Sequence, residues 1–257
     1  MHDAAFEIAI MRRAFKMPSE VQSEMNTQAA HQILSSTGWL SSQPLGFQVR
    51  FLEASEIRSL PANSTVYGLD DPPGGVYGIA EGFVDVLAAP GPFSTRLVHV
   101  ASAGWWVGEA AAVTFTTRRV ELRSRTQISV AYIAARKLDR MAECDPTIWR
   151  NIASLTVRHL DSAMLYAASF ASTDLKLRVL MTLMRTIGPA LDRGGSMELP
   201  IGQAELAELT GLSRNTVTRL LSKLSDEGYL KRNYGSVTVN VSRLRSLVNT
   251  ASPLNSV

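Results

Sequence analysis

The stretch PIGQAELAELTGLSRNTVTRLLSKL (residues 200–224) contains two helical segments separated by a sharp turn. We expect Ala204–Thr210 to form the first helix, and Gly211 can adopt the left-handed conformation that ends it. Ser213 supplies a side-chain oxygen that can cap a second helix. A short helix, a glycine turn and a capped second helix together predict a helix-turn-helix.

Packing within this motif leaves one face of the second helix polar. Ala207 is small enough to let the two helices cross closely, and Val217 can fill the angle between them. The other inward-facing residues would be Leu220, Leu221 and Leu224. The residues left facing outward are Arg214, Asn215, Thr218, Arg219 and Ser222.

This outward-facing set suits the major groove of double-stranded DNA. Arginine can donate two hydrogen bonds to guanine, and asparagine can pair in a similar way with adenine. Ser213 and Thr216, near the start of the second helix, can approach a phosphate. The alternative is an ordinary helical hairpin whose polar face is solvated.

A β-hairpin follows in the stretch GYLKRNYGSVTVNV (residues 228–241). Strands over Tyr229–Arg232 and Ser236–Val241 would flank an Asn-Tyr-Gly turn and form a wing that carries Lys231 and Arg232. Because the cap, the turn glycine, the buried valine and the wing all agree, the sequence predicts a winged helix-turn-helix that binds DNA.

The middle of the chain has a different rhythm. From about Ile57 to Val130, short alternating runs are separated by turn residues such as those at 70–75, a pattern that predicts a barrel or sandwich-like β domain. Residues 1–56 are expected to be mainly helical, with a break near SQPLG (residues 42–46).

A long helix is predicted over Thr147–Ala171, which contains neither Gly nor Pro. An apolar seam follows steps of three and four residues, as in paired helices, and predicts a homodimer. Its residues are Val157, Leu160, Met164, Ala167 and Ala171. The alternative is that this helix packs on its own domain. His159 is expected to be solvated or to contact the second protomer, and the cap residues Ser172, Thr173 and Asp174 predict a hinge.

Composition, the cysteine count and the motifs limit the kinds of protein that this sequence can encode. The 257 residues are 46% hydrophobic and 19% charged, and no run is long and apolar enough to span a bilayer or to serve as a signal peptide, so a cytoplasmic protein is expected. Cys144 is the only cysteine, and no cluster of metal ligands is evident, so we expect no metal. No hydrolase, Walker-type or dinucleotide-binding motif occurs, so an enzyme with a regulatory module is the weaker alternative.

The order of these parts resembles the CRP/FNR family of bacterial transcription regulators over about residues 31–250. The residues that carry the resemblance are WLSSQP (39–44), residues 60–86, Gly108-Glu109, Asp174 with Arg178, and LSRNTVTRLLSKL (212–224). The implied fold is α+β, with a cyclic-nucleotide-binding-like β-roll of the double-stranded jelly-roll type. The expected divisions are a helical N-terminal extension at 1–30, the β-roll at 31–141, a dimerisation helix and hinge at 142–173, and the winged helix-turn-helix at 174–257.

The resemblance also implies partners and roles. It implies a homodimer on a palindromic operator, RNA polymerase as a further partner, and a signal that enters through the β-roll. Arg214, Asn215 and Arg219 occupy the base-reading positions of the family. The cyclic-AMP receptor branch commonly has glutamate where this chain has Asn215, so a different base pair is expected there. A DNA-binding protein whose β-roll only dimerises is an alternative.

The effector pocket departs from the pattern of the family. Gly108, Glu109 and Arg118 match the cassette that holds cyclic AMP, but Arg119 replaces a small hydroxyl residue. The adenine-contacting positions of the family are Ala163 and Met164, which offer no useful hydrogen bond. We therefore expect no tight binding of cyclic AMP. The alternatives are another small anionic effector, a cyclic nucleotide held by a retuned cassette, and a structural Glu109–Arg118 pair. Trp105 and Trp106 are expected in the β-roll core, with a ligand site as the alternative.

Overall fold

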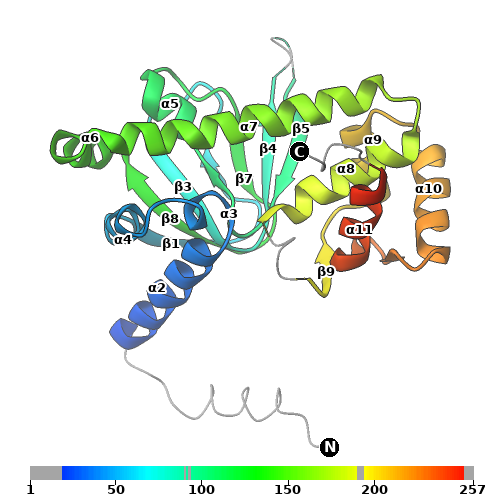
Figure 1. The fold of residues 1–257 in the computed structure, drawn as a ribbon, viewed down its shortest axis with the longest axis horizontal. Coiled ribbons are helices and arrows are strands. Elements are labelled where there is room, and N and C mark those ends of the chain that lie inside the picture. Colours follow the sequence, from blue (N-terminus) through cyan, green and yellow to red (C-terminus); the bar gives the residue numbers. More distant parts are fainter. Residues whose placement is uncertain (1–18, 90, 92–93, 190–193, 252–257) are drawn as a thin grey trace, which may run out of the picture.

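The computed structural model describes residues 19–89, 91, 94–189 and 194–251, and it shows an α+β chain (Figure 1). Three helices come first: α2 (Ser19–Ser36), α3 (Gly38–Ser41) and α4 (Leu45–Glu53). The break predicted near residues 42–46 lies between α3 and α4, where Pro44 is the N-cap of α4. Residues 1–18 of the expected helical extension lie outside the described residues. Its expected end at residue 30 lies inside α2, which continues to Ser36.

Two four-stranded antiparallel sheets form the predicted β-roll. Their strand orders are β1-β8-β3-β6 and β2-β7-β4-β5. The strands are β1 (Glu56–Leu60), β2 (Thr65–Tyr67), β3 (Gly75–Glu81), β4 (Val84–Ala88), β5 (Arg96–Ala101), β6 (Trp106–Val107), β7 (Glu121–Ser124) and β8 (Ile128–Ala134). A short helix, α5 (Glu109–Thr114), lies between β6 and β7. The alternating pattern between Ile57 and Val130 therefore does correspond to strands.

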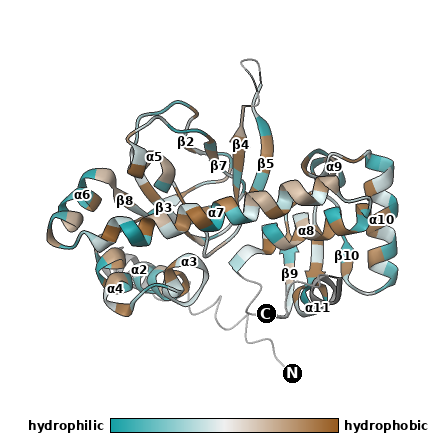
Figure 2. Ribbon diagram, turned by 45° about the horizontal axis from the view of Figure 1, so that its top comes forward, coloured by the Kyte–Doolittle hydropathy of each residue, from teal (hydrophilic) through white to brown (hydrophobic). Residues whose placement is uncertain are grey.

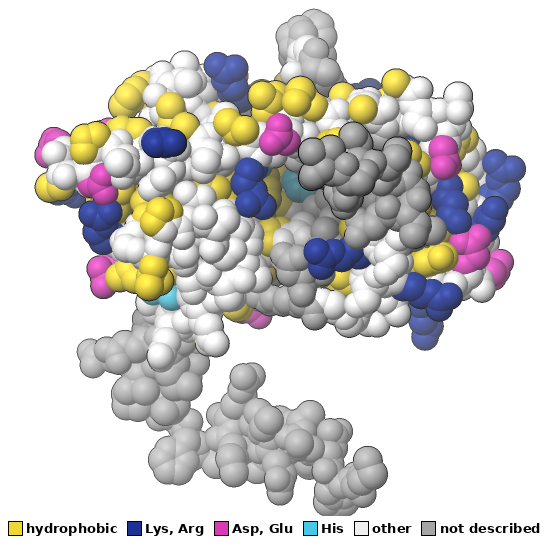
Figure 3. Space-filling view, viewed as in Figure 1, with side chains coloured by type: hydrophobic (Ala, Val, Ile, Leu, Met, Phe, Trp, Pro, Cys, Tyr) yellow, Lys and Arg dark blue, Asp and Glu magenta, His cyan; other side chains and the backbone are white. Residues whose placement is uncertain are grey.

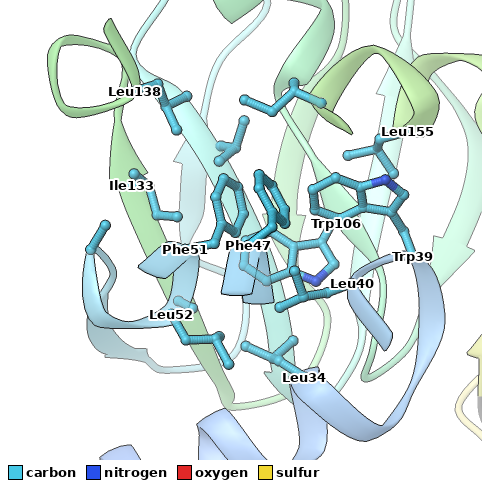
Figure 4. Close-up of a cluster of buried hydrophobic side chains, with 14 of the residues drawn as sticks. Leu34, Trp39, Leu40, Phe47, Phe51, Leu52, Trp106, Ile133, Leu138 and Leu155 are labelled. Atoms are coloured by element: carbon cyan, nitrogen blue, oxygen red, sulfur yellow. The ribbon is translucent and has the colours of Figure 1, made fainter. Parts of the chain in front are cut away.

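The N-terminal helices share a core with the first sheet. Trp39 packs edge-on against Trp106 with ring centroids 5.9 Å apart, and Phe47 stacks on Phe51 at 4.8 Å (Figure 4). All four side chains are buried, as is Leu34 of α2. The hydrophobic effect therefore attaches α2–α4 firmly to the β-roll. Trp106 is a core residue, as expected.

Helix α6 (Ala135–Cys144) leads into α7 (Thr147–Ala171), which runs along the β-roll toward the C-terminal domain (Figures 1 and 2). Ile148, Ile152 and Leu155 in the first half of α7 are buried. The apolar side chains exposed on α7 are Val157, Leu160, Met164, Leu165 and Phe170. Ala163, Ala167 and Ala171 are exposed as well.

The C-terminal domain begins with α8 (Leu175–Ile187) after a break at residues 172–174. The remaining elements are β9 (Ser196–Leu199), α9 (Gln203–Thr210), α10 (Arg214–Asp226), β10 (Leu230–Arg232), β11 (Val237–Asn240) and α11 (Val241–Ala251). The wing is three-stranded, in the order β10-β11-β9. The sequence pattern predicted the hairpin but not β9 or α11. Within the described residues, no helix is long and apolar enough to cross a membrane.

Candidate functional site

The helix-turn-helix has the local geometry that its sequence predicts. Gly211 ends α9 with φ +64°, in the left-handed region. Ser213 has extended backbone, and its Oγ accepts a hydrogen bond from the amide of Thr216 at 3.2 Å. Val217, Leu221 and Leu224 are buried against α9 and the rest of the domain core. These contacts hold α10 at a fixed angle to α9.

The outer face of α10 and the wing presents basic and amide groups to solvent. Six of the predicted DNA-contacting residues are exposed: Ser213, Arg214, Asn215, Arg219, Lys231 and Arg232. Among the described residues, no carboxylate forms a salt bridge with Arg214, Arg219, Lys231 or Arg232. Lys and Arg side chains lie at this end of the molecule, with Asp and Glu side chains between them (Figure 3). The face is therefore available to an anionic partner.

The hydroxyl groups of this set are already used locally. Thr218 Oγ1 donates to the carbonyl of Arg214 at 2.9 Å and also lies 2.7 Å from Gln203 Oε1. Ser222 Oγ donates to the carbonyl of Thr218 at 3.1 Å. Thr216, Thr218 and Ser222 are only partly exposed. Arg214, Asn215 and Arg219 are therefore better placed than the hydroxyls to reach a base, and their contacts with DNA remain a prediction.

The β-roll pocket is a cavity of about 220 Å³ beside Gly108. Gly108 has φ +97°, and a Cβ at this position would lie 2.5 Å from the carbonyl oxygen of Gly75 and 2.7 Å from Arg118 Nη1. Arg118 is buried and donates to the carbonyls of Gly108 at 3.1 Å and Gly75 at 2.9 Å. Its guanidinium also lies 4.4 Å from the centre of the Tyr67 ring. Arg118 thus bonds to the backbone around the cavity.

Glu109 pairs with His159, not with Arg118. The buried Glu109 carboxylate accepts a hydrogen bond from His159 Nδ1 at 2.9 Å, and the His159 ring packs on Trp105 at 5.3 Å. The prediction of a solvated His159 was wrong, and so was the alternative of a Glu109–Arg118 pair. The reason is that α7 lies against the β-roll and brings His159 into the pocket wall. Contact of His159 with a second protomer remains a prediction.

The remaining positions of the cyclic-AMP cassette do not bring to the cavity the hydroxyl groups that the family usually has there. Arg119 lines the cavity and is exposed. Ala163 and Met164 are exposed on α7 and are not part of the cavity wall. Trp105 is half-buried and does line the cavity, so it is a pocket residue, unlike the fully buried Trp106. Among the described residues, no group of three His, Cys, Asp or Glu side chains could hold a metal ion.

Comparisons with known proteins agree with this architecture. Residues 57–145 match the family model of the cyclic nucleotide-binding domain, and residues 177–247 match that of the Crp-like helix-turn-helix domain. The chain is 30% identical over 190 residues to the CRP-like protein Clp of Xanthomonas campestris pv. campestris, a match that covers 70% of this chain and 82% of Clp. The chain belongs to the CRP/FNR family. It is a transcription regulator of the CRP/FNR type.

Solved structures of the CRP/FNR family share the fold. The structure of the c-di-GMP responsive global regulator CLP of Xanthomonas campestris has a TM-score of 0.58 and 27% identity, covering 76% of this chain and 99% of that one. FixK2 of Bradyrhizobium japonicum has a TM-score of 0.62 and 22% identity, covering 75% of this chain and 96% of its own. The family is made of transcription regulators, in line with the absence of enzyme motifs from the sequence.

In this CRP/FNR regulator, the residues between α7 and α8 are held by hydrogen bonds. Asp174 caps α8 by accepting from the amides of Lys176 and Leu177. Arg178 donates to the carbonyls of Phe170 at 2.9 Å and Ser172 at 3.3 Å. The break predicted at Ser172, Thr173 and Asp174 is present, whereas its action as a hinge remains a prediction.

A second connection between the domains involves Arg125, at the start of the turn from β7 to β8. Its guanidinium pairs with Asp85 of β4 at 2.5 Å and with Glu205 of α9 at 2.8 Å, and it donates to the carbonyl of Pro200 at 2.6 Å. Burial raises the pKa of Asp85, and Arg125 opposes that shift. No local sequence pattern indicates this connection, because its residues come from three separate parts of the chain: Asp85, Arg125 and the stretch 200–205.

Proposed function

We propose that this CRP/FNR regulator reads a palindromic operator as a homodimer, with α10 of each protomer in the major groove. The observation that carries the proposal is the exposed set of Arg214, Asn215 and Arg219 on a helix fixed by its cap and its buried valine. The exposed apolar stripe of α7 supports dimerisation, because a second copy of α7 would bury it. RNA polymerase is the further partner that family membership suggests.

Loss of a base-specific contact and loss of a phosphate contact change the DNA affinity and its salt dependence in different ways. After selection of an operator from random DNA, Arg219→Ala should lower the ratio of operator to random-DNA affinity by about 5- to 150-fold. Lys231→Ala should weaken binding to both DNAs alike and make the slope of log affinity against log salt shallower by about 0.9, the value for one phosphate. Arg136→Ala, an exposed arginine on α6, is the charge-matched control. Full discrimination by Arg219→Ala in a gel-shift competition would contradict the proposed reading of bases.

For the β-roll pocket, we propose that it does not bind cyclic AMP tightly. Its volume of about 220 Å³ is below the roughly 300–1,000 Å³ of common small-molecule sites. Glu109 is engaged by His159, and Arg118 bonds to two backbone carbonyls, so neither group is free for a ribose or a phosphate without rearrangement. A calorimetric titration with cyclic AMP is therefore expected to show no saturation at micromolar concentrations.

A retuned nucleotide pocket is the second candidate. Arg118 Nε has no hydrogen-bond partner among the described residues, and exposed Arg119 adds a cation at the rim. Two cations would suit a small anionic effector with more charge than cyclic AMP. Since the similar Xanthomonas protein is described as c-di-GMP responsive, cyclic di-GMP is the second titrant. Saturable binding of cyclic AMP that Arg119→Ser strengthens would replace the first proposal with a cyclic-nucleotide-gated regulator.

A further inference from the structure

A larger cavity lies where the β-roll, α7, α8 and α11 meet. Its volume is about 570 Å³, within the range of roughly 300–1,000 Å³ that small-molecule sites occupy. It is distinct from the β-roll pocket, although Trp105 and His159 line both. Histidine atoms are visible in a recess on this face, with a basic side chain beside them (Figure 3).

The walls of this cavity, which we call the joint cavity, are basic. Its charged and titratable lining residues are His99, Arg158, His159, Arg185 and Arg245. None of the lining residues that the structure describes is an Asp or a Glu. Arg158 and Arg185 bring positive charge to this recess, and none of its described lining residues supplies a carboxylate, so the recess attracts anions.

Arg185 of α8 is the most unusual of these cations. Its guanidinium stacks over the Tyr166 ring at 4.0 Å from the centroid, and no carboxylate among the described residues forms a salt bridge with it. Burial lowers the pKa of Arg185, although Tyr166 opposes the shift. A partly buried charge without a counter-charge is unfavourable, so an anion beside Arg185 would be stabilising.

Several residues that line the joint cavity also carry a buried nitrogen without a hydrogen-bond partner among the described residues. Within the described part of the chain, four buried side-chain nitrogens lack a hydrogen-bond partner. Three of them belong to residues that line the joint cavity: Arg185 Nε, Trp106 Nε1 and His159 Nε2. His159 uses Nδ1 for Glu109, and its Nε2 has no hydrogen-bond partner among the described residues. A buried nitrogen that is left unpaired is unfavourable.

We propose that the joint cavity binds a small organic anion with a phosphate or carboxylate group, and that Arg185 is its main contact. The Arg185 guanidinium would donate to the anion, and the half-buried Trp105 ring would cover the organic part. Because the cavity touches the β-roll, α7, α8 and α11, a bound anion would connect the sensor domain to the DNA-binding domain.

The test uses the full-length protein without DNA, and inorganic pyrophosphate and citrate as probes. Tryptophan fluorescence and calorimetry should show saturable binding of at least one probe. Pyrophosphate alone would indicate a phosphate ligand, citrate alone a carboxylate ligand, and both a general anion site. Each of these outcomes supports the proposal. Since no operator is present, failure here would leave the proposed reading of DNA untouched.

Matched variants locate the site. Arg185→Gln should weaken binding by at least about tenfold, the loss expected for one charge-assisted hydrogen bond. Arg119→Gln removes an equal charge from the β-roll pocket and should change the affinity less than twofold. Ser162→Glu, which places a carboxylate at the wall of the joint cavity, should abolish binding even if Arg185→Gln fails to fold. The proposal is overturned if neither probe saturates, or if Arg119→Gln weakens binding while Arg185→Gln and Ser162→Glu do not.

Discussion

At the scale of single residues, His99 shows how the joint cavity affects stability. The ring lies 5.5 Å from that of Trp105, on the β5 side of the cavity. Burial is the main reason that the pKa of His99 lies well below its usual value of 6.5, and the charge of Arg185 and then that of His159 lower it further. The folded protein therefore takes up a proton at His99 less readily than the unfolded chain does.

This difference predicts a loss of stability in mild acid. The contribution of a neutral His99 is complete above pH 6.5 and falls as the pH is lowered below that value, because the unfolded chain then binds the extra proton. Between pH 7.5 and pH 5.5 the free energy of unfolding should fall by on the order of 1 kcal/mol. Thermal unfolding at the two pH values should show a smaller decrease for His99→Gln than for the wild type. His31, whose pKa is also lowered by burial, contributes equally to both proteins. Equal decreases would contradict the assignment.

Gly108 is required by the backbone of the β-roll pocket. An alanine there would have to adopt φ +97° and place its Cβ 2.5 Å from the Gly75 oxygen. The left-handed conformation alone costs about 1–2 kcal/mol, so Gly108→Ala should lower the thermal midpoint markedly. Gly46→Ala is the matched control, since a Cβ at that helical position meets nothing within 4 Å. It should be neutral or slightly stabilising. A Gly108→Ala protein as stable as the control would show that the pocket backbone can relax.

At the scale of elements, sequence patterns were informative where the determinants are local. Gly211, Ser213 and Val217 lie in one short segment, and each acts on its immediate neighbours, so α9 and α10 could be predicted closely. The pairing of Glu109 with His159 joins residues 50 positions apart. No local pattern indicates such a contact, because it depends on how α7 lies against the β-roll. The strand β9 was missed for the same reason, since its partner β11 lies across two helices in the sequence.

The apolar face of α7 makes the predicted dimer testable. Leu160 is 56% exposed in the single chain, on the seam expected to pair with a second α7. A glutamate there would bury two like charges across the dimer axis, so Leu160→Glu should give a monomer in light scattering coupled to gel filtration. Val49→Glu, at an apolar position of α4 that is 46% exposed, should leave the dimer intact. A dimeric Leu160→Glu protein would indicate that another surface pairs the protomers.

At the scale of the whole molecule, the β-roll and the DNA-binding domain pack against each other and are not connected by residues 172–174 alone. Val100 of the β-roll is buried in the same apolar cluster as Leu183 of α8. Ser102 Oγ donates to the carbonyl of Ile187 at 2.9 Å, and the Tyr166 hydroxyl donates to the carbonyl of Leu209. A signal that reorients α10 must therefore break polar contacts and expose apolar surface, and both impose a barrier on the switch.

Arg125 is the side chain through which this barrier can be measured. It is 12% exposed and joins the β-roll to Glu205 of α9, so Arg125→Met should loosen the docking of the DNA-binding domain. Hydrogen–deuterium exchange should then become faster at the amides of residues 201–206, while the two β-roll sheets keep their protection. Arg123→Met is the matched control, because Arg123 pairs with Glu121 within the β-roll and should leave α9 unchanged.

Glu205→Gln separates the two roles of Glu205, its charge and its hydrogen bond to the amide at the start of α9. A glutamine retains an acceptor for the amide of Gly202, 2.9 Å from the carboxylate in the wild type, but loses the ion pair with Arg125. We consider the double variant that combines Arg125→Met with Glu205→Gln. If the ion pair holds the domains together, the amides of residues 201–206 should exchange no faster in this double variant than in Arg125→Met, because Arg125→Met by itself already abolishes that ion pair. Additive acceleration would mean that the two residues act separately. The shared core around Val100 would then be the main restraint on the DNA-binding domain.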